Sequence, residues 1–301
     1  RQHEFLRDNA LGSYRELLHG IARDPAMLEY LDNRSNRKQR PNENFARELM
    51  ELFTLGEGNY TEQDVKEAAR AFTGWTTARG DFIDRRGRHD RGVKRVLGRR
   101  GRFEGSAVLD ILLEEQACAR YVAGRILAYL EGVPTSPERL ERYAELLRAE
   151  DYELTPLFEA LFADPVFYGP EVVGARIASP IDFMVGTSRR LGIQPAPRLV
   201  YAGSQALGQR LFFPPNVKGW EGGEAWITTS TMMMRGNLAG VLLGQLDVRD
   251  VVGRGFHLTA TADPRTSDAG PGADGPGMDG SMSMEGGDAM EGSMADETVE
   301  P

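Results

Sequence analysis

Four charged residues on one predicted helix could do acid–base or cation-binding chemistry. Within residues 42–54, Glu43, Arg47 and Glu51 recur every four residues, and Glu48 precedes Glu51 by three. On a helix this spacing places the four side chains close together. Paired carboxylates beside an arginine could bind a cation or hold a general acid and base. The same spacing also describes an ordinary ladder of ion pairs that only stabilises the helix.

A second group of reactive residues is His89-Asp90, followed after four residues by Lys94. A histidine beside a carboxylate can act as a base or as a metal ligand. A metal site would need carboxylates from elsewhere in the chain. The expected sources are Glu48, Glu51 and Asp32. Alternatively, His89 and Asp90 only fix a loop through hydrogen bonds. The sequence identifies no cofactor.

The third group lies on a predicted rigid loop that Pro214-Pro215 introduces. Its polar and aromatic residues are Asn216, Lys218, Trp220 and Trp226. The lysine and the tryptophans could line a groove for a carbohydrate or a peptide, with Asn42 and Glu43 as further binding candidates. Equally, the tryptophans could fill the core where this loop packs on the helices. The sequence leaves both alternatives open.

The elements that must position these residues are predicted to be mainly α-helices. The expected helices span about 13–23, 42–54, 61–72, 106–115, 116–131, 137–149 and 156–163, with further starts at Pro180, near Pro197 and at about Ser230. Ser, Thr, Asp and Asn are preferred at the first position of a helix, where a side-chain oxygen accepts a backbone hydrogen bond. The predicted caps are Ser13, Asp24, Asn42, Thr61, Ser136 and Thr155. Short alternating segments indicate a small β-hairpin or ribbon around 75–103, and nothing indicates a parallel sheet.

The chain divides by composition into a multi-helix globular domain, 1–258, and a disordered, acidic, Met- and Gly-rich tail, 259–301. Ten acidic residues and one basic residue between 261 and 301 account for the whole net charge of −9. A weak Cu(I) site among the tail methionines is one interpretation, because thioether sulfur is a soft ligand. A flexible, low-complexity linker explains the same composition.

Charge and hydropathy exclude some partners. The balanced charge of the domain gives no reason to expect a nucleic acid, although residues 79–102 contain ten Lys or Arg and three acids. That basic segment is interpreted as a solvated loop, since it has few aromatic residues to stack on bases. No apolar run approaches the roughly 18 to 20 residues of a membrane-spanning helix. Cys118 is expected to be a small core residue, not a nucleophile.

Several sequence blocks in a fixed order carry a family resemblance. They are Tyr30–Asn33, Pro41–Gly56, Tyr60–Val65, Ala71–Trp75, His89–Lys94 with Leu97-Gly98, Ser179–Val185, and Pro214–Trp220 with Gly222-Gly223 and Trp226-Ile227. Together these blocks, within roughly residues 10–245, resemble the bacterial domain-of-unknown-function 1800 (DUF1800) family. The resemblance implies that the chain lacks the N-terminal helical portion usual in that family.

The resemblance implies little about activity, because the family has no established reaction. Its members are often exported, so a periplasmic or secreted protein is expected, and they are often encoded beside a sulfatase-like (DUF1501-type) protein. The leading hypothesis is therefore an exported binding or assembly protein with a sulfatase-like partner. The alternative is a metal-dependent or His/carboxylate hydrolase. Convergence of the three groups of residues in one concave pocket would favour the enzyme.

Overall fold

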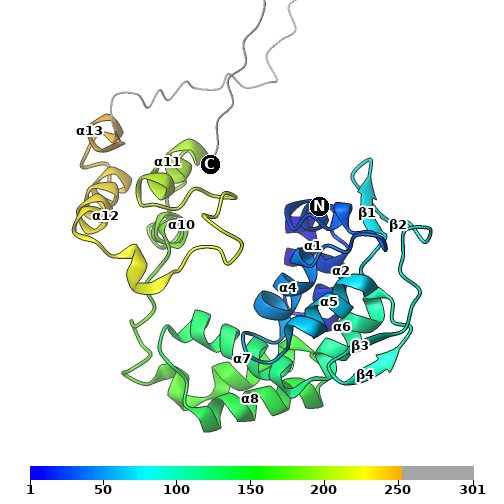
Figure 1. Ribbon diagram of the computed structural model, residues 1–301. Coiled ribbons are helices and arrows are strands. Elements are labelled where there is room, and N and C mark those ends of the chain that lie inside the picture. Colours follow the sequence, from blue (N-terminus) through cyan, green and yellow to red (C-terminus); the bar gives the residue numbers. More distant parts are fainter. Residues whose placement is uncertain (253–301) are drawn as a thin grey trace, which may run out of the picture. The chain divides into compact units, whose positions relative to one another are not determined.

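The structure is a computed structural model that describes residues 1–252. It is mainly helical, as the sequence predicts, and it contains two small antiparallel strand pairs (Figure 1). The predicted disordered tail, 259–301, and the copper interpretation of its methionines lie outside the described residues. The division of the chain at residue 258 stays a prediction.

The first part of the chain is a series of short helices. They are α1 (Gln2–Asp8), α2 (Tyr14–Ala22), α3 (Pro25–Tyr30), η1 (Asn33–Ser35), α4 (Asn44–Glu48), η2 (Leu49–Thr54) and α5 (Glu62–Ala71). Three predicted caps form here and later in the chain. The Asp24 carboxylate accepts from the amide of Met27, Thr61 and Asp64 form a reciprocal capping box, and Ser136 accepts from the amide of Arg139.

Two predicted caps are wrong for a common reason. The side chain of Ser13 makes no capping hydrogen bond, and α9 begins at Leu154, before Thr155. Ser13 and Glu153 instead form an antiparallel β-bridge, and the hydrogen bonds around it satisfy backbone groups at the starts of both helices. The Tyr14 amide donates to the carbonyl of residue 152, and the Thr155 hydroxyl donates to the carbonyl of residue 11. Contacts between distant parts of the chain therefore replace the local caps.

The predicted helix 42–54 changes its winding halfway along. It begins as α4 and continues as the π-helix η2, in which the Leu55 amide and the Thr54 hydroxyl each bond to a carbonyl five residues earlier, at 2.7 and 2.8 Å. Met50, near the start of this wider turn, is fully buried. Asn42 lies before the helix, where its side chain still accepts a hydrogen bond from the Asn44 amide at 3.0 Å.

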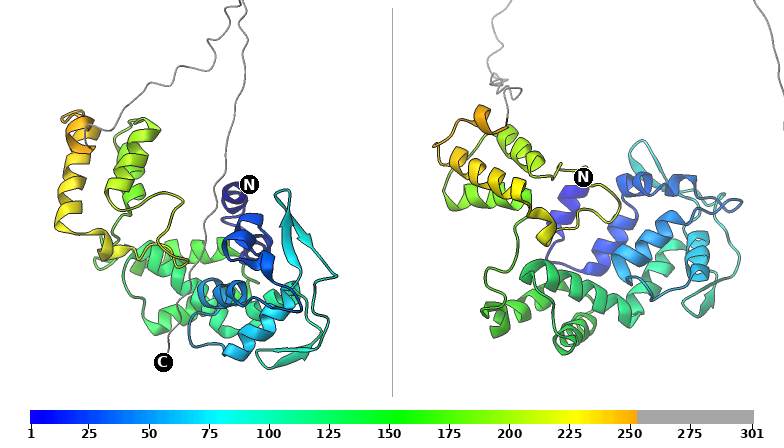
Figure 2. Two further views of the ribbon diagram at one scale, coloured as in Figure 1. Left: turned by 45° about the horizontal axis from the view of Figure 1, so that its top comes forward. Right: turned by 60° about the vertical axis from the view of Figure 1, so that its left-hand side comes forward.

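The β-ribbon predicted around 75–103 consists of two separate hairpins. Strand β1 (Trp75–Ala78) pairs with β2 (Asp81–Asp84), and β3 (Lys94–Val96) pairs with β4 (Arg99–Gly101). The β1–β2 hairpin lies at the edge of the helical body in all three views (Figures 1 and 2). The segment between β2 and β3 carries the predicted residues His89 and Asp90.

The remaining helices resume after β4. They are α6 (Gly105–Glu114), α7 (Gln116–Glu131), α8 (Pro137–Ala149), α9 (Leu154–Ala163), η3 (Pro165–Tyr168), α10 (Pro180–Arg190), α11 (Pro197–Ala206), η4 (Gly223–Trp226), α12 (Thr229–Leu242) and α13 (Val248–Val252). Helices α7 and α8 pack against each other as an antiparallel pair (Figure 1). None of the helices in residues 1–252 combines the length and apolar character that a membrane span requires.

Two hydrophobic clusters hold these helices together. The larger one runs from α2 to α9 and contains Phe45 and Phe72, whose rings meet edge to face 5.0 Å apart. Cys118 is fully buried within it, and burial raises the pKa of its thiol to about 12. The smaller cluster centres on Met184 of α10 and Leu238 of α12.

Candidate functional site

The charged face of α4 and η2 is shared between two different neighbours. Arg47 donates two hydrogen bonds to the Glu62 carboxylate, at 2.6 and 2.7 Å, and a longer one to Glu43 at 3.3 Å. The predicted ion pair between Glu43 and Arg47 therefore forms, and the second partner of Arg47 is Glu62 of α5. The continuation of the predicted ladder to Glu51 does not form, because the π-turn carries Glu51 away toward other partners.

Glu51 connects η2 to the predicted rigid loop. Its carboxylate lies 2.9 Å from the ammonium of Lys218 and accepts a hydrogen bond from the Tyr60 hydroxyl at 3.2 Å. Lys218 also pairs with Glu57 at 2.8 Å. Hydrogen bonds from Lys218 to Glu57 and Glu51 raise its pKa, while burial and then the Glu51 charge raise the pKa of Tyr60 to about 12. Two of the three predicted groups of residues therefore meet here.

Glu48 lies beside this cluster in a different state. Burial, and then the negative charge of Glu51, raise the pKa of its carboxyl group. Among residues 1–252, the side chain of Glu48 has no hydrogen-bond or ion-pair partner. A carboxyl group with a raised pKa beside a second carboxyl group is an arrangement that enzymes use for a general acid and its partner.

The second group, His89-Asp90, is engaged by its own surroundings. His89 Nδ1 lies 2.9 Å from the carbonyl oxygen of Thr73, and the Asp90 amide donates to the Thr73 hydroxyl at 2.8 Å. The Asp90 carboxylate accepts two hydrogen bonds from Arg70, at 2.8 and 3.2 Å. These hydrogen bonds hold the pKa of Asp90 below its usual range. The contacts fasten the loop to the end of α5.

Lys94 completes this fastening from inside. Its side chain is buried, and its ammonium donates to the carbonyl oxygens of Asp90 at 2.5 Å and Gly92 at 3.2 Å. Burial lowers its pKa. The contacts of His89, Asp90 and Lys94 therefore lie within their own loop and with the end of α5. None of these hydrogen bonds involves Glu51 or Lys218.

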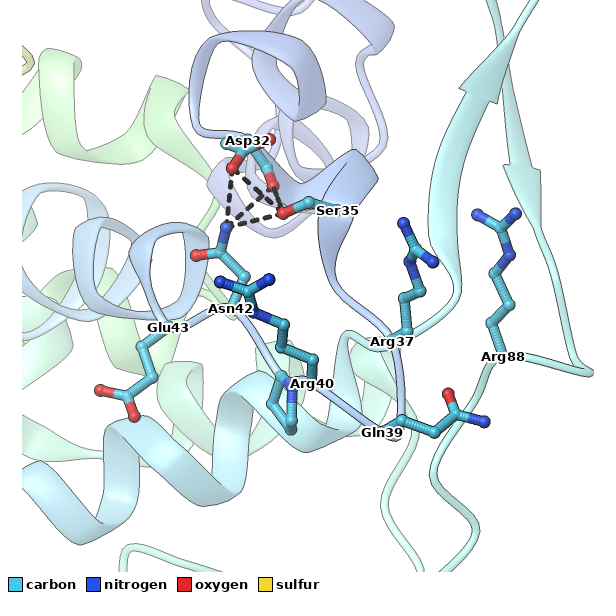
Figure 3. A pocket seen from close by; sticks show the side chains of 9 residues that line it. Asp32, Ser35, Arg37, Gln39, Arg40, Asn42, Glu43 and Arg88 are labelled. Atoms are coloured by element: carbon cyan, nitrogen blue, oxygen red, sulfur yellow. Dashed lines mark hydrogen bonds between the residues drawn. The ribbon is translucent and has the colours of Figure 1, made fainter. Parts of the chain in front are cut away.

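Asn42 and Glu43 line a pocket of about 960 Å³ on the outside of the loop that precedes α4 (Figure 3). Asp32 forms part of the same wall. Its carboxylate accepts a hydrogen bond from the side-chain amide of Asn42 at 2.9 Å and another from the Ser35 hydroxyl at 3.0 Å. Asp32 itself has a left-handed backbone, with φ +54°, which costs a non-glycine residue about 1 kcal/mol or more. The surrounding hydrogen bonds hold it there.

A buried amide network supports this pocket from below. Asn36 is 1% exposed, and its side chain donates to the Asn33 side chain at 3.0 Å and to the carbonyl of Ala69 at 2.9 Å. The side-chain oxygen of Asn36 accepts a hydrogen bond from the backbone amide of Asn42 at 3.0 Å. The Gly74 amide donates to the Asn36 carbonyl at 3.2 Å, which joins the loop to the start of β1.

Three arginines that the sequence reasoning did not single out also line the pocket: Arg37, Arg40 and Arg88. The Lys38 amide donates to the Arg88 carbonyl at 2.9 Å, so two segments fifty residues apart share one wall. Figure 3 shows the side chains of Arg37 and Arg88 pointing in the same direction. The available signal was the run 34–40, which contains four basic residues and no acid.

The third group is split between contact and packing. Lys218 reaches Glu51, as described, whereas Asn216 is exposed and its carbonyl accepts from the Gly219 amide at 3.1 Å. Trp226 is buried, and Trp220 is partly buried. Trp226 therefore follows the packing alternative.

Within residues 1–252, no group of three or more His, Cys, Asp or Glu side chains is arranged to hold a metal ion.

One family model matches the chain. It is described as "Protein of unknown function (DUF1800)" and matches residues 1–292. No curated protein and no solved structure matches the chain.

Proposed function

The chain belongs to the DUF1800 family, and we propose that it is a binding or assembly protein that works with a sulfatase-like partner outside the cytoplasm of a bacterium. The exported location and the partner come from the resemblance described above. The binding role comes from the way in which the polar residues of the chain are used.

One observation supports binding over catalysis. His89 and Asp90 have the strongest resemblance to catalytic groups. Nδ1 of His89 is hydrogen-bonded to the Thr73 carbonyl, and the Asp90 carboxylate is hydrogen-bonded to Arg70. A general base needs an atom within hydrogen-bonding reach of a substrate; the Asp90 carboxylate and His89 Nδ1 are occupied, which leaves only Nε2 of this pair for proton transfer. The same loop brings Arg88 to a pocket whose arginines have no acidic partner among the described residues. The loop thus supports a surface that can bind a ligand.

The test is co-purification of the full-length natural protein with the sulfatase-like protein encoded beside it. Both are co-expressed with export signals, and the periplasmic fraction is analysed by size-exclusion chromatography with light scattering. We expect one species with the summed mass of both chains. Two separately eluting proteins, or a chain retained in the cytoplasm, would contradict the proposal.

A hydrolase is the second candidate, and the pair Glu48 and Glu51 favours it. Glu51 is paired with Lys218, whereas Glu48 is partly buried, has no side-chain partner within residues 1–252, and has a carboxyl pKa that burial raises. Metal content, measured by mass spectrometry on the full-length natural protein and on Glu48→Gln and His89→Ala variants, discriminates the two functions. A stoichiometric metal lost in both variants would favour a metal-dependent enzyme. No metal, with unchanged folding, would favour binding.

A further inference from the structure

The pocket of Figure 3 contains three arginines that form no ion pair within residues 1–252. Several arginines elsewhere are paired with acids: Arg70 binds Asp90 at 2.8 Å, and Arg139 binds Glu131 at 2.6 Å. Arg37, Arg40 and Arg88 have no such partner within residues 1–252. The lining holds these three guanidinium groups and two carboxylates, Asp32 and Glu43, so it carries an excess of positive charge that a bound anion would balance.

The backbone that carries these arginines is held in place before any ligand arrives. The amides of Arg37 and Arg40 each donate to the carbonyl of the other residue, at 3.4 and 2.8 Å. The Lys38 amide fixes this turn to the Arg88 carbonyl, and the buried Asn36 fixes it to α5. A pre-organised site loses less conformational entropy on binding than a flexible one does.

The other lining residues indicate what accompanies the anionic group. Asp32, Asn42 and Glu43 present carboxylate and amide oxygens, which accept hydrogen bonds from hydroxyl groups. Guanidinium groups bind carboxylate, sulfate or phosphate through paired hydrogen bonds. A ligand that offers both hydroxyl groups and anionic groups satisfies both halves of the pocket.

We propose that this pocket binds an acidic oligosaccharide, a chain of sugars that carries carboxylate or sulfate groups. The inference rests on the proposed binding function and names the ligand class of that function. A nucleic acid fits less well, because no aromatic side chain lines the pocket to stack on a base. An acidic peptide also fits less well, because Pro41 alone among the lining residues offers an apolar surface to anchor a side chain.

The experiment measures binding of a fluorescein-labelled oligogalacturonide to the full chain by anisotropy at low salt. One variant combines Arg37→Gln, Arg40→Gln and Arg88→Gln. The matched control removes the same charge from neighbouring exposed arginines outside the pocket lining, through Arg85→Gln, Arg86→Gln and Arg91→Gln. Circular dichroism confirms that both variants fold.

We expect the pocket variant to bind at least about 100-fold more weakly, because each charged hydrogen bond contributes roughly tenfold, and the control to change little. Dextran sulfate should compete with the labelled sugar, while neutral dextran, polyglutamate and a single-stranded oligonucleotide should not.

Equal losses in the two variants, or absence of binding to the wild type, would overturn the site. Equal competition by polyglutamate or the oligonucleotide would overturn the ligand class. If the pocket variant still co-purifies with the sulfatase-like protein, a failed sugar titration leaves the assembly function standing, so the two proposals fail independently.

Discussion

Two nitrogens of the Arg70 guanidinium donate hydrogen bonds to the Asp90 carboxylate, at 2.8 and 3.2 Å. The two side chains are 26% and 18% exposed, so the ion pair is largely shielded from water. Because Asp90 also accepts from the Gly92 amide at 2.7 Å, the pair closes the loop that leads to β3. The pair is therefore assigned to stability and not to chemistry.

Asp90→Asn should lower the free energy of unfolding by about 2 kcal/mol at neutral pH, the contribution typical of hydrogen bonds to a charged group. Denaturant unfolding measures it. Asp81→Asn is the control, since that exposed carboxylate pairs only with Arg1 and its loss should matter far less. Equal stability of Asp90→Asn and the wild type would contradict the assignment.

The same variant has an expected pH dependence. The hydrogen bonds from Arg70 depress the folded-state pKa of Asp90. A depressed carboxyl pKa gives stability that is present above the unfolded-state pKa of about 4 and is lost as pH falls through the folded-state pKa. The difference between wild type and variant should therefore shrink below about pH 4. A difference that grows on acidification would show the opposite sign.

Lys94→Met should loosen the loop 89–94, because the carbonyl oxygens of Asp90 and Gly92 lose their donor. We expect a loss of about 2 kcal/mol of stability, together with faster hydrogen exchange of the loop amides. Exchange measured by mass spectrometry separates this local effect from global unfolding. Unchanged exchange in the loop would show that Lys94 does not hold it.

Glu48→Gln should stabilise the protein at pH 7. Burial and the Glu51 charge raise the folded-state pKa of Glu48, so stability is full below the unfolded-state pKa and is lost as pH rises through the folded-state pKa. Removing the charge should recover on the order of 0.5 kcal/mol at pH 7 and nothing at pH 3. Thermal unfolding at both values tests this.

Glu62→Gln is the contrasting control for that experiment. Its hydrogen bonds from Arg47 lower the pKa of Glu62, so the substitution should destabilise at pH 7. If both substitutions shift the melting temperature in the same direction, the difference between the two carboxyl groups is refuted.

Lys218→Met should release the loop 214–222 from η2, since Lys218 pairs with both Glu51 and Glu57. Amide exchange in this loop should rise, and added salt should reproduce part of the effect in the wild type, because exposed ion pairs are screened. The melting temperature should stay the same. Lys66→Met, at an exposed position of α5, is the control. Protection that survives Lys218→Met would exclude the contact as a tether.

The elements governed by neighbours in the sequence could be predicted. Helices α7 and α8 have the predicted bounds, 116–131 and 137–149, and Ser136 caps α8 through a residue only three positions away. The capping box of Thr61 is equally local. In such cases the hydrogen-bond partner is fixed by helix geometry, so the sequence alone identifies it.

The features that depend on distant partners could not be predicted. The π-turn at Leu49–Thr54 keeps the helical pattern of apolar residues but redirects Glu51 from Arg47 to Lys218, 167 positions later. The pocket likewise depends on the hydrogen bond that joins Lys38 to Arg88. Asn42 and Glu43 were identified as binding candidates, whereas the arginines opposite them required the three-dimensional structure.

Among residues 1–252, Arg70 and Arg139 are paired with acids and maintain the fold, whereas the pocket arginines form no ion pair and can bind a ligand. Modification of arginines by phenylglyoxal, followed by peptide mass spectrometry, measures this division for each side chain. Arg37, Arg40 and Arg88 should react about tenfold faster than Arg70 and Arg139, because a charged hydrogen bond protects by roughly that factor. Equal rates for Arg88 and Arg70 would contradict the claim.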